Sequence, residues 1–375
     1  MKNITIVGGG NQAHALIGVL SGKDYSVSML TRKAPEITKT MHRHNGINIY
    51  HADKNVTQHA KPINVASNAS ELIPNSDIII ITNPANDRAR VLKEIAPYIS
   101  KTKTVLVGAI PGWGGFHWLA ENKLNHAKGA IIWALKDTPV MASHLEPGKK
   151  VTQLGKKEIL YYAVNKPDEE KKKLVRSELE NIFEEKSIYC DDFIEFSLCA
   201  GNPIEHLPII YGKIGPYSQW DGKPFKTQPF FYENISELEA YFVKKADEEQ
   251  QSLVNKIREE HGITLSHAIP LKDDIIKLYG DQIENTSTLY QTIRTNAAYK
   301  SIKIPMKATD GGYQFDLNHR IFSEDIPYGL DIFIEIGKRL GLETPFLIEL
   351  RTWLSSIGAS YTESAVDYIP KDAFI

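Results

Sequence analysis

The sequence predicts an α/β protein, with an N-terminal Rossmann-like, doubly wound domain followed by a mainly α-helical domain. A glycine-rich turn directly follows the first apolar strand, strands and helices alternate through the first half, and longer helical periodicities follow. The 375 residues also suggest two domains, because single hydrophobic cores stop growing beyond about 250–300 residues. We therefore expect domains over residues 1–190 and 191–375, with the ligand site in the cleft between them.

The first strand and the turn after it carry a dinucleotide-binding pattern. The apolar run Asn3–Val7 leads into Gly8-Gly9-Gly10-Asn11-Gln12-Ala13, which has the form G-x-G-x-x-A. Gly8 permits the tight turn, Gly10 lets the backbone approach a pyrophosphate, and Ala13 allows close packing of helix and strand. The N-terminus of the following helix offers free N–H groups and a positive dipole end to the phosphates.

The second strand bears on the choice of cofactor. Residues 25–30 read as a strand, and Thr31-Arg32-Lys33 follow, with Arg32 lying 22 residues after Gly10. An NAD site usually has an acidic residue near this point for the ribose 2′-hydroxyl, whereas two cations suit a 2′-phosphate. We expect NADP(H) to be preferred over NAD(H); the alternative is that both cations are solvated surface charges.

Further β–α units complete the first half. Strands are expected at Asp77–Thr82, Thr104–Ala109 and Ala130–Leu135, with helices at Asn86–Ile99 and Lys166–Lys186 and a hairpin of Lys150–Gln153 with Glu158–Val164. Ligands bind at the carboxyl ends of such strands, so Pro84, after one strand, joins the expected cofactor site. The predicted cofactor-binding residues are Gly8, Gly10, Asn11, Gln12, Ala13, Thr31, Arg32, Lys33 and Pro84.

The second half shows long amphipathic segments at Ile235–His261, Ser287–Ala298 and Ser323–Gly341. In the last of these, Ser323 is expected to cap the helix and Gly341 to end it. This assignment places Asp325 in the first helical turn, where the helix dipole favours an ionised carboxylate.

Composition excludes several classes of protein. The net charge of −2 gives no electrostatic case for binding nucleic acid or a membrane surface. The two cysteines, Cys190 and Cys199, argue against a disulfide framework and a structural zinc site, and His42, His44 and His51 are expected on the surface without metal. No apolar stretch could span a bilayer and no signal segment is evident, so we expect a cytoplasmic protein.

Two segments of the helical half carry candidate chemistry: Gly201–Pro208 and Arg320–Leu330. His206 could transfer a proton, Asp325 could orient the imidazole and raise its pKa, and Arg320 could grip a carboxylate. A His–Asp pair is the minimal acid/base unit for hydride transfer to C=O or C=N.

These segments resemble the opine dehydrogenase family, which includes the octopine and nopaline dehydrogenases. Asn202-Pro203-Ile204-Glu205-His206 is similar to an N-x-x-x-H element of the family, and Arg320 through Leu330 is similar to its R-x-x-(T/S)-E-D-(I/V)-P-(Y/F)-G-L element. Thr227–Glu233 also resembles the family. The resemblance covers essentially the whole chain and implies His206 and Asp325 as the catalytic pair, with Arg320 and Asn202 contacting substrate.

The resemblance implies reductive condensation of an amino acid with a 2-oxo acid, usually pyruvate or 2-oxoglutarate, to an N-carboxyalkyl amino acid. Some bacterial relatives use this reaction to finish metallophores. The chain departs from the family at Asp137–Ser143, where a T-L-P-W-type run is frequent. Thr138 is expected to line the substrate site, but neither substrate is identified by the sequence, and the oligomeric state stays open, a homodimer included.

Other interpretations remain open. A ketopantoate-type 2-oxo-acid reductase is also Rossmann plus helical, but its catalytic Lys has no evident counterpart, and a non-catalytic NADP(H)-binding sensor would predict a degraded acid/base pair. Among the residues, His117 is the runner-up to His206, although a structural role at a helix start fits it better. Arg320 could instead form an interdomain salt bridge, and Asp325 could be only a first-turn charge.

Overall fold

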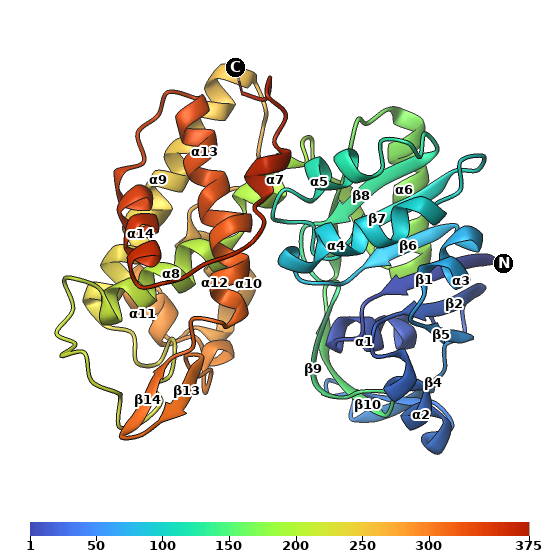
Figure 1. Cartoon of the computed structure of the whole chain (residues 1–375), viewed down its shortest axis with the longest axis horizontal. Helices are drawn as coiled ribbons and strands as arrows, with labels where there is room; N and C mark the ends of the chain where they lie inside the picture. Colours follow the sequence, from blue (N-terminus) through green and yellow to red (C-terminus); the bar gives the residue numbers. More distant parts are fainter. Residues whose placement is uncertain (375) are drawn as a thin grey trace. The chain divides into compact units, whose positions relative to one another are not determined.

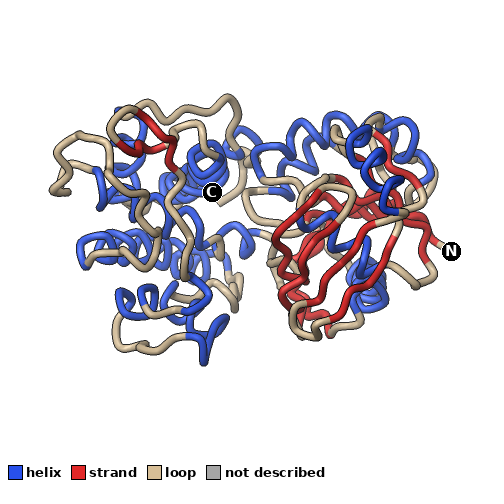
Figure 2. The backbone as a smooth tube through the Cα atoms, turned by 90° about the horizontal axis from the view of Figure 1, so that it is seen from below, coloured by secondary structure: helices blue, strands red, loops and turns tan. Residues whose placement is uncertain are grey.

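The computed structural model describes residues 1–374 and divides the chain into two compact units, Met1–Phe193 and Ile194–Ile375. The division falls after Phe193, where the sequence suggested a boundary after residue 190. The first unit is a sheet flanked by helices and the second is mainly helical, which confirms the predicted fold class (Figures 1 and 2).

The main sheet of the first unit has eight strands in the order β12-β11-β8-β7-β6-β1-β2-β5. The six strands from β8 to β5 are parallel, and their order around β1 is that of a doubly wound dinucleotide-binding sheet. Strand β11 pairs antiparallel with β8 and parallel with β12. The strands are β1 (Lys2–Val7), β2 (Tyr25–Leu30), β5 (Asn64–Ala66), β6 (Ile78–Ile81), β7 (Val105–Ala109), β8 (Ala130–Leu135), β11 (Ile159–Val164) and β12 (Lys186–Tyr189).

The centre of this sheet is the hydrophobic core of the unit. Strand β6 consists of four consecutive isoleucines, each at most 1% exposed. Both faces of such a strand must be covered, because successive side chains point to opposite faces. The covering helices are α1 (Asn11–Leu20), α2 (Ala34–His44), α3 (Ala69–Leu72), α4 (Ala85–Ile95), α5 (Phe116–Lys123) and α6 (Glu169–Phe183). The strands predicted near residues 25–30, 77–82, 104–109 and 130–135 are confirmed.

The predicted hairpin of Lys150–Gln153 with Glu158–Val164 is wrong. Strand β10 (Lys150–Lys156) instead pairs antiparallel with β9 (Val140–Glu146) and parallel with β3 (Ile47–His51), which pairs with β4 (Val56–Ala60). The turn between β9 and β10 contains Gly148 at φ +72°, a conformation that favours glycine. This turn closes the β9–β10 hairpin, and the resulting four-stranded sheet is an addition that the sequence reading missed.

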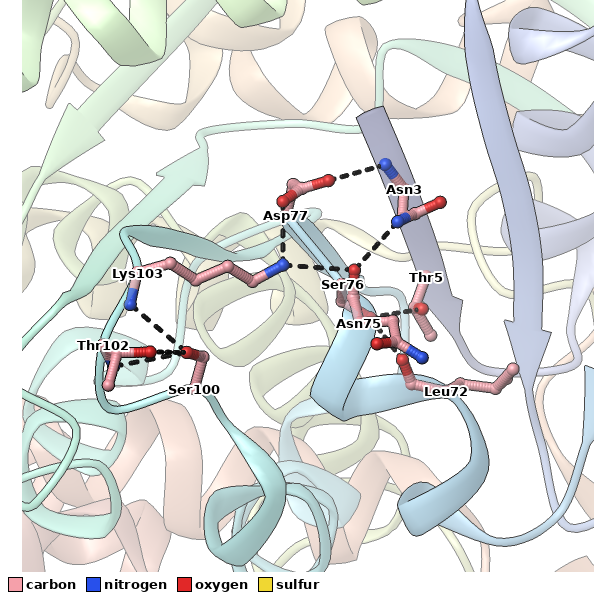
Figure 3. A network of polar contacts seen from close by, with 9 residues as sticks. All are labelled: Asn3, Thr5, Leu72, Asn75, Ser76, Asp77, Ser100, Thr102 and Lys103. Atoms are coloured by element: carbon pink, nitrogen blue, oxygen red, sulfur yellow. Dashed lines mark hydrogen bonds and ion pairs between the residues drawn. The ribbon is translucent and has the colours of Figure 1, made fainter. Parts of the chain in front are cut away.

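A polar network links the starts of the central strands (Figure 3). The Asp77 carboxylate, just before β6, accepts hydrogen bonds from the backbone N–H of Asn3 and from Lys103, both at 2.8 Å. Beside it, the hydroxyls of Thr5 and Ser76 lie 2.7 Å apart. Burial opposes ionisation of Asp77, but Lys103 and the Asn3 N–H outweigh it and lower the pKa of the carboxyl. The network ties together the amino ends of the strands, opposite the carboxyl ends where such sheets bind ligands.

The second unit is built around the long helix α9, which packs against α8. Ser236 and Glu239 form a capping box at the start of α9, and Gly262 ends it in the left-handed conformation. A short hairpin of β13 (Met306–Thr309) and β14 (Gly312–Phe315) lies in the same unit. Its helices are α7 (Ile194–Leu198), α8 (Gly201–Ile214), α9 (Glu237–His261), α10 (Leu271–Tyr279), α11 (Leu289–Arg294), α12 (Arg320–Asp325), α13 (Asp331–Arg339) and α14 (Pro345–Ser356).

The predicted helix Ser323–Gly341 is corrected in its start and its continuity. Helix α12 begins at Arg320 and its cap is His319, whose ring accepts a hydrogen bond from the N–H of Ile321 at 3.3 Å. Ser323 lies inside α12, and Asp325 is its last residue, so neither the predicted cap nor the first-turn dipole argument holds. A π-helical segment, Ile326–Leu330, follows before α13, because Pro327 has no N–H to continue the regular ladder.

The π-helical segment packs directly on α8. A Cβ added at Gly329 would collide with the ring of Pro203 in the first turn of α8. The missing side chain therefore lets the two elements approach closely, which brings Asp325 opposite the middle of α8. Among the described residues, no helix is both long and apolar enough to cross a membrane.

Candidate active site

The glycine-rich turn of the first unit has the open space that a bound phosphate group needs. Gly8 adopts φ +134°, and a Cβ there would collide with Thr82, whereas a Cβ at Gly10 would meet no heavy atom within 4 Å. Helix α1 begins directly after Gly10 and its start has no side-chain cap and no acidic residue. The first-turn N–H groups and the positive dipole end therefore face this open side of the turn.

His14 forms a hydrogen bond with the backbone carbonyl of the glycine-rich turn, a role that the sequence did not predict. Its Nδ1 donates to the carbonyl oxygen of Gly10 at 2.9 Å, and its Nε2 accepts from the N–H of Gly148 at 3.0 Å. The side chain is fully buried. Burial lowers the pKa of His14, so the ring stays neutral and can donate on one side while it accepts on the other. The β9–β10 turn is thus joined to the dinucleotide turn.

Two buried polar atoms beside the turn fit a cofactor. Nε2 of Gln12 and Oδ1 of Asn83 are buried without hydrogen-bond partners in the described chain. Buried polar groups in proteins are nearly always paired, so these atoms are available to a ligand. Pro84 stands at the uncapped start of α4, and Asn11 is exposed at the start of α1. With the open space at Gly10, this arrangement fits a dinucleotide.

The candidate ribose-phosphate residues lie after β2. The side chain of Arg32 is 70% exposed, and its guanidinium lies 3.7 Å from the carboxylate of Asp87. Asp87 is also bound by Arg90 at 2.7 Å, so Arg32 is a secondary partner. Lys33 is exposed and its N–H donates to the hydroxyl of Thr31 at 3.3 Å. Exposed ion pairs are weak, so Arg32 can leave Asp87 for a phosphate at little cost.

In the second unit, the structure brings together His206 and Asp325. Nδ1 of His206, on α8, lies 2.8 Å from Oδ2 of Asp325, at the end of α12. The Asp325 side chain is 2% exposed and the His206 side chain is 16% exposed. The carboxylate fixes Nδ1 as a hydrogen-bond donor, which leaves Nε2 as the atom that can exchange a proton.

Electrostatics favour a protonated imidazole at this site. Burial disfavours the charged ring, but the hydrogen bond and charge of Asp325, with the charge of Glu205, outweigh it and raise the pKa of His206 above 6.5. Arg320 acts in the opposite direction. Glu205 is itself 5% exposed, and its Oε1 has no hydrogen-bond partner among the described residues. Burial raises the pKa of Glu205 to about 7.

Tyr232 completes the cluster. Its hydroxyl lies 3.0 Å from Nε2 of His206, and the side chain is 6% exposed. Tyr232 lies in the segment Thr227–Glu233, which resembles the family, but no chemical role for it followed from the sequence. The contact joins residues 26 positions apart across a loop, which no sequence periodicity reports.

In the described structure, no hydrogen bond joins the other predicted substrate residues, Arg320, Asn202 and Thr138, to His206 or Asp325. Arg320 is 64% exposed and lies 3.8 Å from Glu324 on its own helix. Asn202 is exposed in the first turn of α8, and Thr138 is half-buried between β8 and β9 of the first unit.

The runner-up, His117, lies in the first turn of α5 and stacks on Phe193 at 4.8 Å. Burial lowers the pKa of His117 to about 3. The ring is therefore neutral near neutral pH and cannot serve as a general acid. His42 and His44 are exposed and His51 is half-buried. Across residues 1–374, no group of three or more His, Cys, Asp or Glu could hold a metal ion.

Comparison with known proteins places this site in a family. Residues 189–357 match the family model for the α-helical domain of NAD/NADP octopine/nopaline dehydrogenases. Residues 4–108 match the ketopantoate reductase PanE/ApbA model. The match to the ketopantoate reductase model lies within the first unit. The match to the octopine/nopaline dehydrogenase model covers most of the second unit, which holds His206 and Asp325.

Individual proteins are similar to this chain over most of its length. Tauropine dehydrogenase of Arabella iricolor is 30% identical over 371 residues, covering 95% of this chain and 91% of the relative. The uncharacterized protein y4xO of Sinorhizobium fredii is 31% identical over 319 residues, covering 84% of each chain. A solved structure of octopine dehydrogenase with NADH and L-arginine superposes with a TM-score of 0.83 at 26% identity, covering 96% of this chain and 90% of the other. The chain therefore belongs to the opine dehydrogenase family, nicotinamide-dependent oxidoreductases that act on CH–NH bonds.

Proposed function

We propose that the chain catalyses the reductive condensation of an amino acid with a 2-oxo acid, pyruvate or 2-oxoglutarate, to an N-carboxyalkyl amino acid. The observation that carries the proposal is the buried hydrogen bond between His206 and Asp325. The family relationship supports it, since octopine dehydrogenase has been solved with L-arginine and with pyruvate.

The proposed roles follow from the chemistry of each side chain. The protonated imidazole of His206 supplies the proton with which the carbonyl oxygen of the 2-oxo acid leaves as water, and Asp325 stabilises that imidazolium. Arg320 grips a substrate carboxylate through its planar fork, and its 64% exposure leaves the fork accessible. Asn202 and Thr138 are proposed as further substrate contacts. Bound nicotinamide cofactor supplies the hydride that reduces the C=N bond.

The cofactor is proposed to be NADP(H) in preference to NAD(H). Arg32 and Lys33 are both exposed after β2, where a 2′-phosphate would need cations. The remaining proposed contacts are Gly8, Gly10, Asn11, Gln12, Ala13, Thr31 and Pro84. Closure of the two units around the substrates, a homodimer and a cytoplasmic location remain predictions.

A matrix of amino acids against 2-oxo acids, followed by loss of NADPH absorbance, tests the proposed function. We expect turnover only when both substrates are present, with product mass equal to the two substrates joined with loss of water and gain of two hydrogens. Reduction of a 2-oxo acid alone would instead support a simple 2-oxo-acid reductase.

A further inference from the structure

Both ring nitrogens of His206 form hydrogen bonds within the protein. Nδ1 bonds to Asp325 at 2.8 Å and Nε2 bonds to the Tyr232 hydroxyl at 3.0 Å. A substrate therefore cannot take a proton from Nε2 while Tyr232 keeps this position.

Tyr232 is held in this position by its neighbours. Its ring stacks on Tyr299 with centroids 4.3 Å apart and an interplanar angle of 28°, and it lies 5.0 Å from the ring of Phe231. The preceding residue is anchored through its backbone, since the N–H of Phe231 donates to Ile302 at 2.6 Å. Swinging the phenol away would break the aromatic stack and expose a buried ring.

We propose that Tyr232 is a catalytic residue whose hydroxyl, at the end of the chain Asp325–His206–Tyr232, hands the proton to the leaving oxygen of the substrate. This role rests on the proposed function, because it specifies which atom performs the proton transfer assigned to the His206–Asp325 pair.

The transfer balances in protons and electrons. With His206 protonated, Nε2–H donates to the phenolic oxygen, which frees the phenolic hydrogen to face the carbinolamine formed from amine and 2-oxo acid. The phenolic O–H bond breaks as an O–H bond forms on the carbinolamine hydroxyl. The C–O bond then breaks, its electron pair leaves with water, and the nitrogen lone pair forms the C=N bond. The Nε2 proton moves to the phenolic oxygen, so Tyr232 is regenerated and His206 becomes neutral.

The charged groups around the hydrogen-bonded series Asp325–His206–Tyr232 favour a concerted proton transfer. Glu205, Tyr279 and Asp325 face Tyr232, and burial together with these groups raises the pKa of its hydroxyl well above 10. A free phenolate is therefore disfavoured, and the hydroxyl must gain one proton as it loses the other. Arg320 and Glu205 also act on His206, with opposite signs.

Tyr232→Phe tests the proposal, because it keeps the stacked ring and removes only the hydroxyl. For the substrate pair that the wild type turns over, we expect kcat to fall by about 10²–10⁴-fold, the usual worth of a positioned acid/base group, with the Kd for NADPH unchanged. Tyr299→Phe is the matched control, since Tyr299 shares the stack but makes no hydrogen bond to His206 in the described structure. We expect it to keep kcat within threefold.

A second variant separates proton transfer from simple positioning of the imidazole. A fluorinated tyrosine at position 232 keeps the hydroxyl and its bond to His206 but makes the phenol more acidic. If Tyr232 relays the proton, kcat for condensation changes systematically with the number of fluorines, whereas a positioning role leaves kcat constant. A constant kcat, or a Tyr232→Phe variant with near wild-type kcat, overturns the proposal. If the wild-type protein turns over no pair of amino acid and 2-oxo acid, the proposed function itself is wrong, and the proton transfer through Tyr232 is wrong with it.

Discussion

Nδ1 of His206 lies 2.8 Å from Oδ2 of Asp325, although the two residues are 119 positions apart in the chain. Three local features produce this contact. His206 lies on α8, Asp325 ends α12, and the π-helical turn after it packs on Pro203 through the bare backbone of Gly329. π-Helical turns are frequent at functional sites, and here the turn sets the carboxylate opposite the imidazole.

Replacing Asp325 by Asn should lower the pKa of His206. The wild-type pKa is raised because the bond and charge of Asp325 outweigh burial, and Asn removes the charge while keeping the shape. Opine oxidation needs a neutral imidazole, so its acid limb should move to lower pH in Asp325→Asn. The pH profile of kcat/KM for oxidation measures this. An unmoved acid limb would show that Asp325 does not tune the imidazole.

Arg32→Ala should weaken NADPH binding much more than NADH binding. The exposed guanidinium has only a secondary contact with Asp87 at 3.7 Å, so its loss should cost little stability. Fluorescence titration of both cofactors gives the two Kd values, and Arg43→Ala, an exposed cation in the last turn of α2, is the control. Equal losses for both cofactors, or a wild type that prefers NADH, would refute the 2′-phosphate assignment.

His14→Ala should weaken the binding of both cofactors and lower stability, because the Gly148 N–H loses its partner and the Gly10 carbonyl keeps only its bond to the backbone N–H of residue 14. A buried group left without a partner costs about 1–3 kcal/mol. His14→Asn should recover part of the loss, since its amide can still reach the Gly10 carbonyl. His126→Ala, which loses a bond to Ala96 away from the turn, is the control. Thermal unfolding with and without NADPH reports both effects, and unchanged cofactor affinity in His14→Ala would exclude the positioning role.

Glu205→Gln should stabilise the protein most at high pH. The pKa of Glu205 is raised from 4.5 to about 7, so the folded state binds a proton that the unfolded state has already lost between these values. Wild-type stability therefore falls as the pH rises through this window, by on the order of 3 kcal/mol from this residue. Chemical unfolding at pH 5 and pH 8 gives the stability of each protein. The gain in the variant should be larger at pH 8, and a gain independent of pH would show that Glu205 ionises normally.

The sequence was most informative where local pattern and burial coincide. The isoleucine run of β6, the strand β8 and the turn at Gly8 could be read from apolar runs and glycine spacing alone. The four-stranded sheet could not, because β10 pairs with β3, about a hundred residues earlier in the chain.

The same limit applies to the site. His206 and Asp325 could be named from the motifs that contain them, but their contact depends on a π-helical turn that helix periodicity does not reveal. Tyr232 and His14 were missed as site residues because their decisive contacts join distant parts of the chain: Tyr232 lies in a loop and reaches His206 on α8, and His14 on α1 reaches the turn at Gly148. Hydrogen bonds of this kind leave no periodic signal in the sequence.

The central claim is that His206 is the source of the proton used in the condensation. The most direct measurement is single-turnover reduction by NADPH with the active substrate pair in wild type and His206→Ala, with NADPH binding measured in parallel. The account predicts a rate lower by about 10²–10⁴-fold with NADPH affinity nearly intact. A variant that keeps near wild-type turnover would contradict the account.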